Sequence, residues 1–429
     1  IYNGTVAQVT GNALSTCSNL TIDNTTGVTQ KNDANTTQNV VVTNQLTLTN
    51  GTYQIGGLTS ELNSLTLNGA AIAGTATNLA STQYSNLIFG GNQPGVTIPS
   101  SITQLNSLTI GNTNTDGVSQ SSSIDLYQST AGVLALNSSS RLFLGNHNLT
   151  ILSNSYSASI SGSFSVNTMV VADGAGRLRK NFGTTGFSSY IFPIGDNSGG
   201  AGNNPSFDYS PFTINFTANS LDRIIGVNVT DAEHPSNAGV TDFASRYWSV
   251  TDSELGNGTY AYLPMSLVYS TNATSDANGT TALYRVNRYD GAWSQFNSTV
   301  SGTTVTTSIS NTHVTGTLGS NDFAIRYNPQ QIYEWIATSG SASWTDPLSW
   351  NPSRFSPQAN DVLLFNQGGT STATGIPTET VAQILFSNNT NTTFIPAAAN
   401  TLSLNGPTLS NNLVVANGST LSLESGLTL

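Results

Sequence analysis

"NSLTLNG" (residues 63–69), "SNLIFGG" (85–91) and "NSLTIGN" (106–112) repeat one short pattern along the first part of the chain. The central leucines of the three segments are 22 and 21 residues apart. In each segment apolar residues alternate with polar ones, which places leucine and isoleucine on one face of a strand and asparagine, serine and threonine on the other. A repeat of this length predicts a coiled fold in which one strand recurs in every turn.

Short runs of the same kind occur before and after these segments. Examples are "NLTID" (19–23), "QLTLTNG" (45–51) and "TMVVADG" (168–174). A single strand with one apolar face cannot bury that face alone, whereas a stack of such strands can. We therefore predict a right-handed parallel β-solenoid of about eight turns over residues 1–180. The alternative is an antiparallel hairpin sandwich, because Asn-Gly also forms tight turns, but connections of about 15 residues are too long for two-residue hairpins throughout.

The pattern changes after Lys180, where tyrosine and phenylalanine become frequent. Segments such as "FDYSPFTINFTA" (207–218) and "YAYLPMSLVYS" (260–270) are longer and aromatic, with turn residues between them. Such spacing is typical of two antiparallel sheets packed face to face. We predict an Ig-like β-sandwich over residues 181–331.

The last part of the chain, residues 332–429, begins with a tryptophan cluster. Trp335, Trp344 and Trp350 lie within sixteen positions, beside prolines. Aromatic residues on irregular chain can cover the open end of a strand stack, so these three are candidate cap or interface residues. Alternation then resumes, as in "STLSLESGLTL" (419–429), and predicts the start of a second β-solenoid. Because that stack ends without a polar cap, we expect that it continues or that a partner covers it.

Two stretches carry a resemblance to a known family. They are "GRLRKNFGTTGFSSYIFPIGD…YSPFTINFTA" (176–218) and "WTDPLSWNPSRFSPQANDVLLFNQGGTSTATGIPTETVAQILFSNNTNTTF" (344–394). Both resemble segments of the large surface proteins that Bacteroidetes export through the type IX secretion system. The resemblance implies an extracellular, cell-surface location, with solenoid and Ig-like modules. Members of that family are adhesins, filament or sheath components, and enzymes with such modules appended.

Composition excludes several classes of protein. Only 8% of the 429 residues are charged and the net charge is −11, which argues against a nucleic-acid partner, because phosphate binding needs a basic surface. No segment is apolar over the roughly 18 residues that a membrane span requires. Cys17 is the single cysteine, so the chain cannot form an internal disulfide.

Few residues of the chain are of types that could bind a metal ion or catalyse a reaction. His147, His234 and His313 lie far apart, in turn-rich contexts that indicate solvated or locally bonded side chains rather than zinc ligands. Residues 112–127 and 229–242 contain aspartates and asparagines but not a recognised calcium spacing. We expect the charged residues of the solenoid, Arg141 among them, to lie in solvated turns. The sequence therefore predicts no catalytic residue, no metal ligand and no cofactor.

Sugar binding is the alternative that the aromatic residues support, because aromatic rings stack on pyranose rings. Tyr260, Tyr262, Tyr289 and Trp293 lie on strands or turns of the predicted sandwich. Aromatic residues of a sandwich also fill its core, and both interpretations stay open at this point. Tyr289 and Trp293, on a hairpin predicted from "NRYDGAWSQF" (287–296), are the candidate carbohydrate contacts.

Together these features predict a non-enzymatic extracellular structural or adhesive protein, a subunit of a filament, sheath or large adhesin. Expected partners are further copies of the chain or neighbouring modules, and surface glycans. The strand in "TVAQVTG" (5–11) and the last turn are the predicted contact edges. Two alternatives remain: a carbohydrate-binding adhesin module, and a polysaccharide lyase or glycosidase built on a solenoid, which would need acidic groups that face one sugar.

Overall fold

The computed structural model shows an all-β chain. It describes residues 1–31, 37–56, 62–128, 130–155, 158–184, 187–197, 207–216, 218–254, 258, 260–262, 264–269, 276–291, 293–296, 298–307, 321–327, 331–355, 357–404 and 411–429. The chain is 53% strand and 2% helix, and the described part contains a β-solenoid of about 14 turns. Three short 3-10 helices are placed in these ranges: η1 (Ala76–Asn78), η2 (Thr281–Leu283) and η3 (Pro347–Ser349).

Parallel sheets run along the N-terminal half of the molecule. The first contains β1 (Tyr2–Gly4), β3 (Thr16–Asn24), β5 (Asn39–Asn50), β7 (Ser64–Leu67), β8 (Ala73–Gly74), β10 (Asn86–Phe89), β13 (Ser107–Ile110), β16 (Leu134–Leu136) and β19 (Ile160–Gly162). The second contains β2 (Gln8–Val9), β4 (Val28–Thr29), β6 (Tyr53–Gln54) and β9 (Leu79–Ala80). Each strand lies beside the corresponding strand of the next turn, so the sheets grow one strand per turn.

Two further sheets begin in the same half and continue beyond it. One contains β11 (Val96–Ile98), β14 (Val118–Gln120), β17 (Arg141–Phe143), β20 (Met169–Val171), β23 (Ile194–Asp196) and β24 (Asp208–Tyr209). The other begins with β12 (Gln104–Leu105), β15 (Ile124–Leu126), β18 (Leu149–Ile151) and β21 (Leu178–Phe182). The pairings of β1 to β20 with one another are parallel, so the hairpin sandwich considered for residues 1–180 is wrong and the solenoid is confirmed.

The three repeated heptads occupy one position in successive turns. Leu87 of β10 lies opposite Leu65 of β7 on one side and Leu108 of β13 on the other. All three side chains are fully buried. On the outer face, Asn106 Nδ2 donates to Asn86 Oδ1 over 2.7 Å, which links neighbouring turns through their polar side chains. The alternation that predicts the strands therefore also separates a leucine core from polar ladders.

The parallel stack passes directly into antiparallel sheets. β21 pairs in parallel with β18 but antiparallel with β27. The sheet that it joins also contains β27 (Arg223–Thr230), β28 (Asp242–Asp252), β31 (Ala277–Asn278), β32 (Arg285–Tyr289), β33 (Trp293–Gln295) and β36 (Asn321–Tyr327). The other antiparallel strands are β22 (Phe187–Phe192), β25 (Phe212–Phe216), β26 (Ala218–Asn219), β29 (Tyr260–Ala261), β30 (Met265–Val268), β34 (Ser298–Ser301) and β35 (Thr304–Thr307). One apolar core, which extends from Leu20 to Ile325, is shared by the parallel and antiparallel strands.

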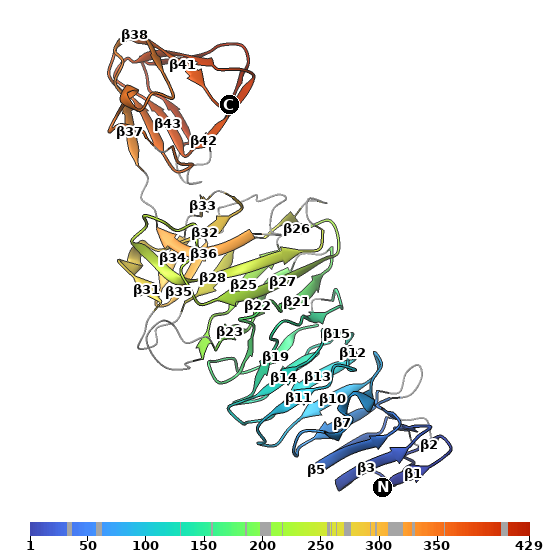
Figure 1. Ribbon diagram of the computed structural model, residues 1–429. Helices are drawn as coiled ribbons and strands as arrows, with labels where there is room; N and C mark the ends of the chain where they lie inside the picture. The colour runs from blue at the N-terminus through green and yellow to red at the C-terminus, as the bar shows by residue number, and fades with distance from the viewer. Residues whose placement is uncertain are drawn as a thin grey trace.

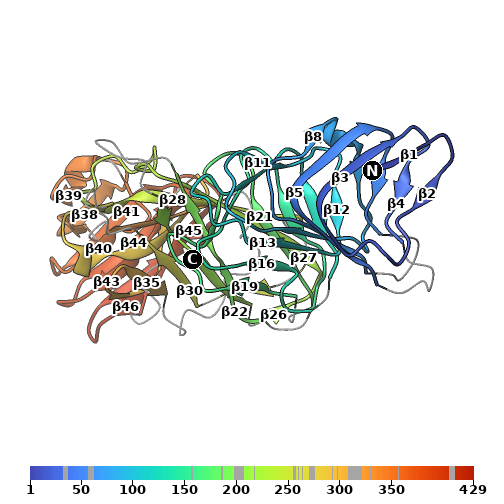
Figure 2. The same ribbon diagram turned by 90° about the horizontal axis from the view of Figure 1, so that it is seen from below.

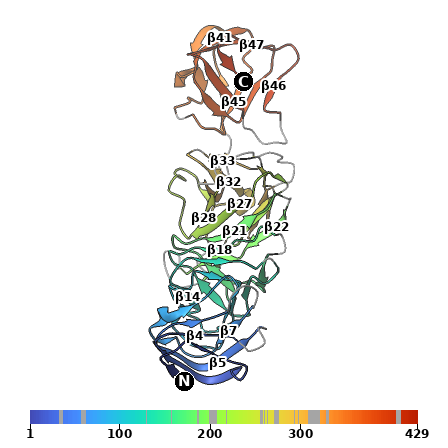
Figure 3. The same cartoon turned by 90° about the vertical axis from the view of Figure 1, so that its right-hand side faces the viewer.

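A separate core lies in the C-terminal part, where parallel pairing resumes. Its strands are β37 (Ile332–Trp335), β38 (Ser339–Ser343), β39 (Trp350–Asn351), β40 (Val362–Phe365), β41 (Thr370–Ile376), β42 (Glu379–Val381), β43 (Gln383–Phe386), β44 (Asn391–Pro396), β45 (Asn400–Leu404), β46 (Leu413–Val415), β47 (Thr420–Leu423) and β48 (Leu427–Thr428). They stack in parallel as β37-β40-β43-β46, β38-β41-β44-β47 and β42-β45-β48, while β39 pairs antiparallel with β37. Figures 1 and 3 show the parts following one another along the long axis of the molecule. The view from below in Figure 2 likewise places β1–β5 and the C-terminal strands at opposite ends.

Candidate functional site

The predicted hairpin around Asp290 and Gly291 is present and forms one side of a pocket. Tyr289 at the end of β32 lies opposite Trp293 at the start of β33. Gly291 in the turn has a φ of +103°, a conformation that residues with a Cβ rarely adopt. The tight turn brings the two rings together, with their centroids 5.0 Å apart. Both side chains are half-buried, so part of each ring faces solvent.

Trp293 is held by contacts on several sides. Its indole Nε1 donates to the backbone oxygen of Ser236 over 2.9 Å. The guanidinium carbon of Arg326 lies 4.3 Å from the centre of the indole ring, a cation–π contact. Arg326 Nε in turn donates to Asn237 Oδ1 over 2.6 Å, and burial lowers the pKa of this arginine to about 10. The indole is therefore fixed in place without a ligand.

His234 packs against both aromatic rings from beneath. Its ring centre lies 4.9 Å from that of Tyr289 and 4.8 Å from that of Trp293. Nδ1 accepts from the backbone N–H of Ser236, so the proton lies on Nε2, which is 3.1 Å from Asp322 Oδ2. Burial raises the pKa of Asp322, but hydrogen bonds from His234 and Ser249 outweigh it and hold the pKa below its usual value.

This His–Asp pair does not have the geometry of a nucleophilic triad. In a triad the histidine lies between the serine and the carboxylate. Here Ser249 Oγ donates to Asp322 Oδ1 over 2.6 Å, so the carboxylate lies between the serine and His234. The second ring nitrogen of His234 accepts a backbone N–H and is not available to activate a hydroxyl. The pair orients the ring beneath the pocket.

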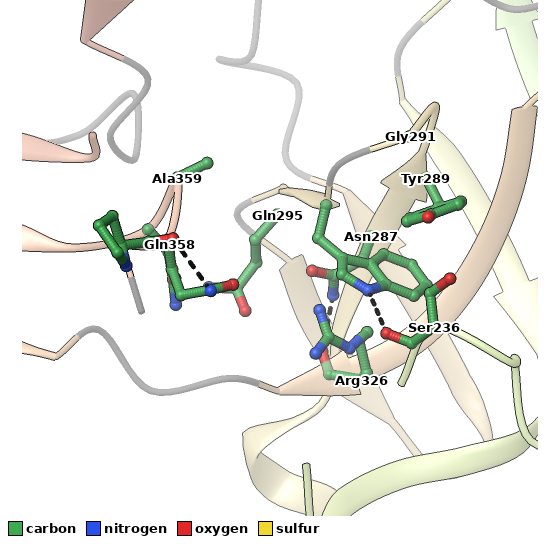
Figure 4. Close-up of a pocket in the computed structure, with 11 residues that line it drawn as sticks. Ser236, Asn287, Tyr289, Gly291, Gln295, Arg326, Gln358 and Ala359 are labelled. Atoms are coloured by element: carbon green, nitrogen blue, oxygen red, sulfur yellow. Dashed lines mark hydrogen bonds between the residues drawn. The ribbon is translucent and has the colours of Figure 1, made fainter. Parts of the chain in front are cut away.

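The pocket has a volume of about 320 Å³. It is lined by Ser236, Asn287, Tyr289, Gly291, Trp293, Gln295, Arg326, Pro357, Gln358, Ala359 and Asn360. In Figure 4, Tyr289, Ser236 and Arg326 lie on one side, while Gln358 and Ala359 lie on the other. Aromatic faces with amide and guanidinium donors match the apolar faces and hydroxyl groups of a sugar. No carboxylate is among these described lining residues, whereas glycoside hydrolysis needs a pair of them.

The structure separates the four tyrosine and tryptophan candidates. Tyr289 and Trp293 line the pocket together, whereas Tyr260 and Tyr262 are buried in the core and are not available to a ligand. Sequence analysis missed Asn287 and Arg326 as pocket residues. Asn287 could have been found, because it lies two positions before Tyr289 and therefore on the same face of the strand. Arg326 reaches the pocket through the pairing of β36 with β32, which the local pattern does not reveal.

Trp335, Trp344 and Trp350 belong to the apolar core of the C-terminal strands. All three are at most 2% exposed, and their rings pack against Phe365 with centroid distances of 5.7 to 6.4 Å. Trp350 Nε1 donates to the backbone oxygen of Trp344, and Trp344 Nε1 to Glu379. Their role as a cap or interface remains a prediction, and any such role would have to act through the turn that they support.

The charged residues of the solenoid are less solvated than expected. The expectation for Arg141 is wrong, because its side chain is buried, stacks on Phe207 at 3.7 Å and donates from Nε to Val166 O over 3.0 Å. Lys180 is also buried, and its Nζ donates to the backbone oxygens of Ser153, Ser155 and Asn181. Carbonyl groups left free by irregular turns satisfy these cations, so they serve the fold.

The three histidines lie in different surroundings. His147 is half-buried in a turn, His234 is locally bonded as expected, and His313 lies outside the described residues. Within the ranges that the structure covers, no helix is long and apolar enough to cross a membrane. Comparison with known proteins finds no matching family model, no matching curated protein and no matching solved structure.

Proposed function

We propose that this chain is a non-enzymatic, extracellular structural or adhesive surface protein, a subunit of a filament, sheath or large adhesin. In this proposal residues 1–180 form a right-handed solenoid, residues 181–331 an Ig-like sandwich, and residues 332–429 a tryptophan-rich cap with a second solenoid. Its support is the change from parallel to antiparallel pairing at β21 and the return to parallel pairing from β37 onward.

The observation that carries the proposal is where the polar groups of the solenoid lie. They bond from turn to turn, as in Asn44 Nδ2 to Asn19 Oδ1 over 2.8 Å, and Asn50 Nδ2 to Asp23 Oδ1 over 2.6 Å. In such ladders each turn provides hydrogen-bond partners for the polar side chains of the next turn, which stiffens the stack. Polar side chains that bond to the next turn stabilise the length and shape of the stack and do not converge on a substrate.

The acidic and nucleophilic side chains that an enzyme would need give little support to the enzyme alternative. A lyase or glycosidase needs acidic groups that face one sugar, and the described lining of the aromatic pocket contains none. The His234–Asp322 pair has the wrong order for a nucleophilic triad. The proposed surface location and type IX export are supported by the resemblance of residues 176–218 and 344–394 to surface proteins of that class.

Self-association is the part of the proposal that can be tested most simply. In the described structure β2 pairs with β4 alone. Val9 of β2 is 49% exposed, and Val6, which precedes the strand, is 69% exposed. In the last described strands, Val415 and Leu423 are 42% and 44% exposed. Unpaired strand edges with exposed apolar residues favour pairing with another chain.

We expect electron microscopy of the purified chain at increasing concentration to show end-to-end filaments. Val9→Lys and Leu423→Lys place a charge at each edge and should suppress them. Thr97→Lys, on an exposed position in the middle of the solenoid, is the matched control and should leave assembly unchanged. Dispersed monomers at every concentration, or equal loss with Thr97→Lys, would contradict the proposal.

A carbohydrate-binding adhesin is the second candidate, favoured by the pairing of Tyr289 with Trp293 at a pocket. On a glycan array we expect Trp293→Ala and Tyr289→Ala each to weaken binding about fivefold, because each removes a stacking interaction of about 1 kcal/mol. Tyr127→Ala is the control, since Tyr127 is an exposed tyrosine of the solenoid. Absence of glycan binding by the unaltered chain, or equal loss in all three variants, would reject this candidate.

A further inference from the structure

Arg246 lies at the centre of a buried group of four aspartates. It is on β28, fully buried, and its guanidinium bonds to Asp196, Asp208, Asp231 and Asp276. Nε is 2.7 Å from Asp276 Oδ2, while Nη2 is 3.1 Å from Asp208 Oδ2 and 3.2 Å from Asp231 Oδ1. Nη1 contacts Asp196. The aspartate side chains are at most 6% exposed, so water contributes little to their solvation.

The charges of this cluster do not balance. One guanidinium faces four carboxylates, which leaves an excess of three negative charges within it. Buried carboxylates are stable only when they are paired, protonated or bound to a metal ion. The cluster therefore favours one more positive charge.

Three of the aspartates are arranged so that they could share one ion. Asp196, Asp208 and Asp231 each offer a carboxylate oxygen, and these oxygens lie within 4.8 Å of one another. Two oxygens on one calcium ion lie at most about 5 Å apart, since each Ca–O distance is about 2.4 Å. Asp231 supplies an independent sign of a missing partner. Its side chain is 4% exposed, Oδ1 accepts from Arg246, and the buried Oδ2 has no hydrogen-bond partner.

We propose that Asp196, Asp208 and Asp231 bind a calcium ion. Calcium prefers oxygen ligands and tolerates irregular geometry, whereas zinc prefers nitrogen and sulfur, and magnesium retains most of its water. Arg246 holds the remaining carboxylate oxygens and orients the three ligands. The ion would balance part of the negative charge and give Asp231 Oδ2 its partner.

The site lies where the solenoid meets the antiparallel strands. Asp196 ends β23, which pairs in parallel with β20 of the solenoid, and Asp208 lies opposite it on β24. Asp231 follows β27, and Arg246 is on β28. These two strands belong to the sheet that also contains β21. A calcium ion here links the sheet that contains β23 and β24 to the sheet that contains β27 and β28. The proposed role is to stiffen this junction, and it stands whether or not the chain forms filaments.

The test uses the full chain, treated with a chelator and then titrated with CaCl₂. Isothermal titration calorimetry should show one calcium per chain, and 1 mM CaCl₂ should raise the unfolding midpoint by about 5 °C or more if it exceeds Kd about a hundredfold. Asp231→Asn should lose both effects. In chelator it should be at least as stable as the unaltered chain, because the substitution removes one repelling charge.

Asp116→Asn, which alters an exposed aspartate of the solenoid, is the matched control and should keep the calcium response. Heat of binding absent from the unaltered chain, or an undiminished response in Asp231→Asn, would overturn the proposal. So would a response to MgCl₂ as large as that to CaCl₂, because the assignment to calcium depends on the dry, irregular set of carboxylates. If Asp231→Asn fails to fold, the calorimetry of the unaltered chain still decides.

Discussion

Arg246→Met is expected to lower the free energy of unfolding of the antiparallel region by about 3–5 kcal/mol, or to prevent its folding. Methionine replaces the apolar stem of arginine with an unbranched apolar side chain. The substitution removes the guanidinium that bonds to Asp196, Asp208, Asp231 and Asp276. Four buried carboxylates would then repel one another without compensation. Urea unfolding, monitored by the fluorescence of the buried Trp248 on the same strand, measures the loss.

The control for this variant is Arg179→Met. Arg179 lies on β21, which is separated from β28 by one strand, β27, in the same sheet. It is only half-buried. We expect its replacement to change the free energy of unfolding by less than about 1 kcal/mol. Both measurements are made in chelator, so that a bound cation does not mask the charge imbalance. Equal stability of the two variants would show that the cluster does not depend on Arg246.

Leu87→Ala is expected to have the second largest effect, a loss of about 2–5 kcal/mol in the solenoid. Leu87 is fully buried between Leu65 and Leu108, and its truncation leaves a cavity within the leucine stack. Because each turn is stabilised by its neighbours, the effect should spread to the adjacent turns. Hydrogen exchange should therefore show faster exchange of the amides of β7, β10 and β13.

The next residue of the same strand provides the matched control. Ile88 points away from the core and is half-buried, so Ile88→Ala should cost about 1 kcal/mol or less. The contrast between neighbours tests the period-two pattern directly, because only one of the two faces contributes to the stack. Equal effects of the two substitutions would contradict the described register.

The parts of the fold that repeat could be predicted from the sequence. The three heptads indicated a common position, and the structure confirms it by placing Leu65, Leu87 and Leu108 in register. The hairpin at Asp290 and Gly291 was equally predictable, because turn residues and flanking aromatic residues are local signals. These features depend on a few neighbouring positions, which a single sequence contains.

The features that depend on convergence of distant segments could not be predicted. Asp196 and Asp208 lie on separate strands and Asp231 follows a third, and their spacing matches no calcium-binding loop. Arg141 appeared to be a solvated turn residue because its partners, Val166 and Phe207, follow much later in the chain. In a chain with few charged residues, each buried cation has partners that only the fold brings together.

The same limit applies to the candidate sites. The pairing of Tyr289 with Trp293 follows from the hairpin, but Arg326 reaches the pocket through the pairing of β36 with β32. Residues 357–360 line it from a segment much later in the chain. For the tryptophan cluster, composition indicated an aromatic group at the start of the last region. It did not indicate that Trp335, Trp344 and Trp350 would form the core with Phe365.

Small-angle X-ray scattering over a concentration series shows whether stacked turns make this chain an elongated, self-associating structural subunit. If copies join at their exposed strand edges, we expect the maximum dimension to grow with concentration while the cross-sectional radius of gyration stays constant. A maximum dimension that does not change with concentration, or a cross-section that grows with it, would contradict end-to-end association of the solenoid.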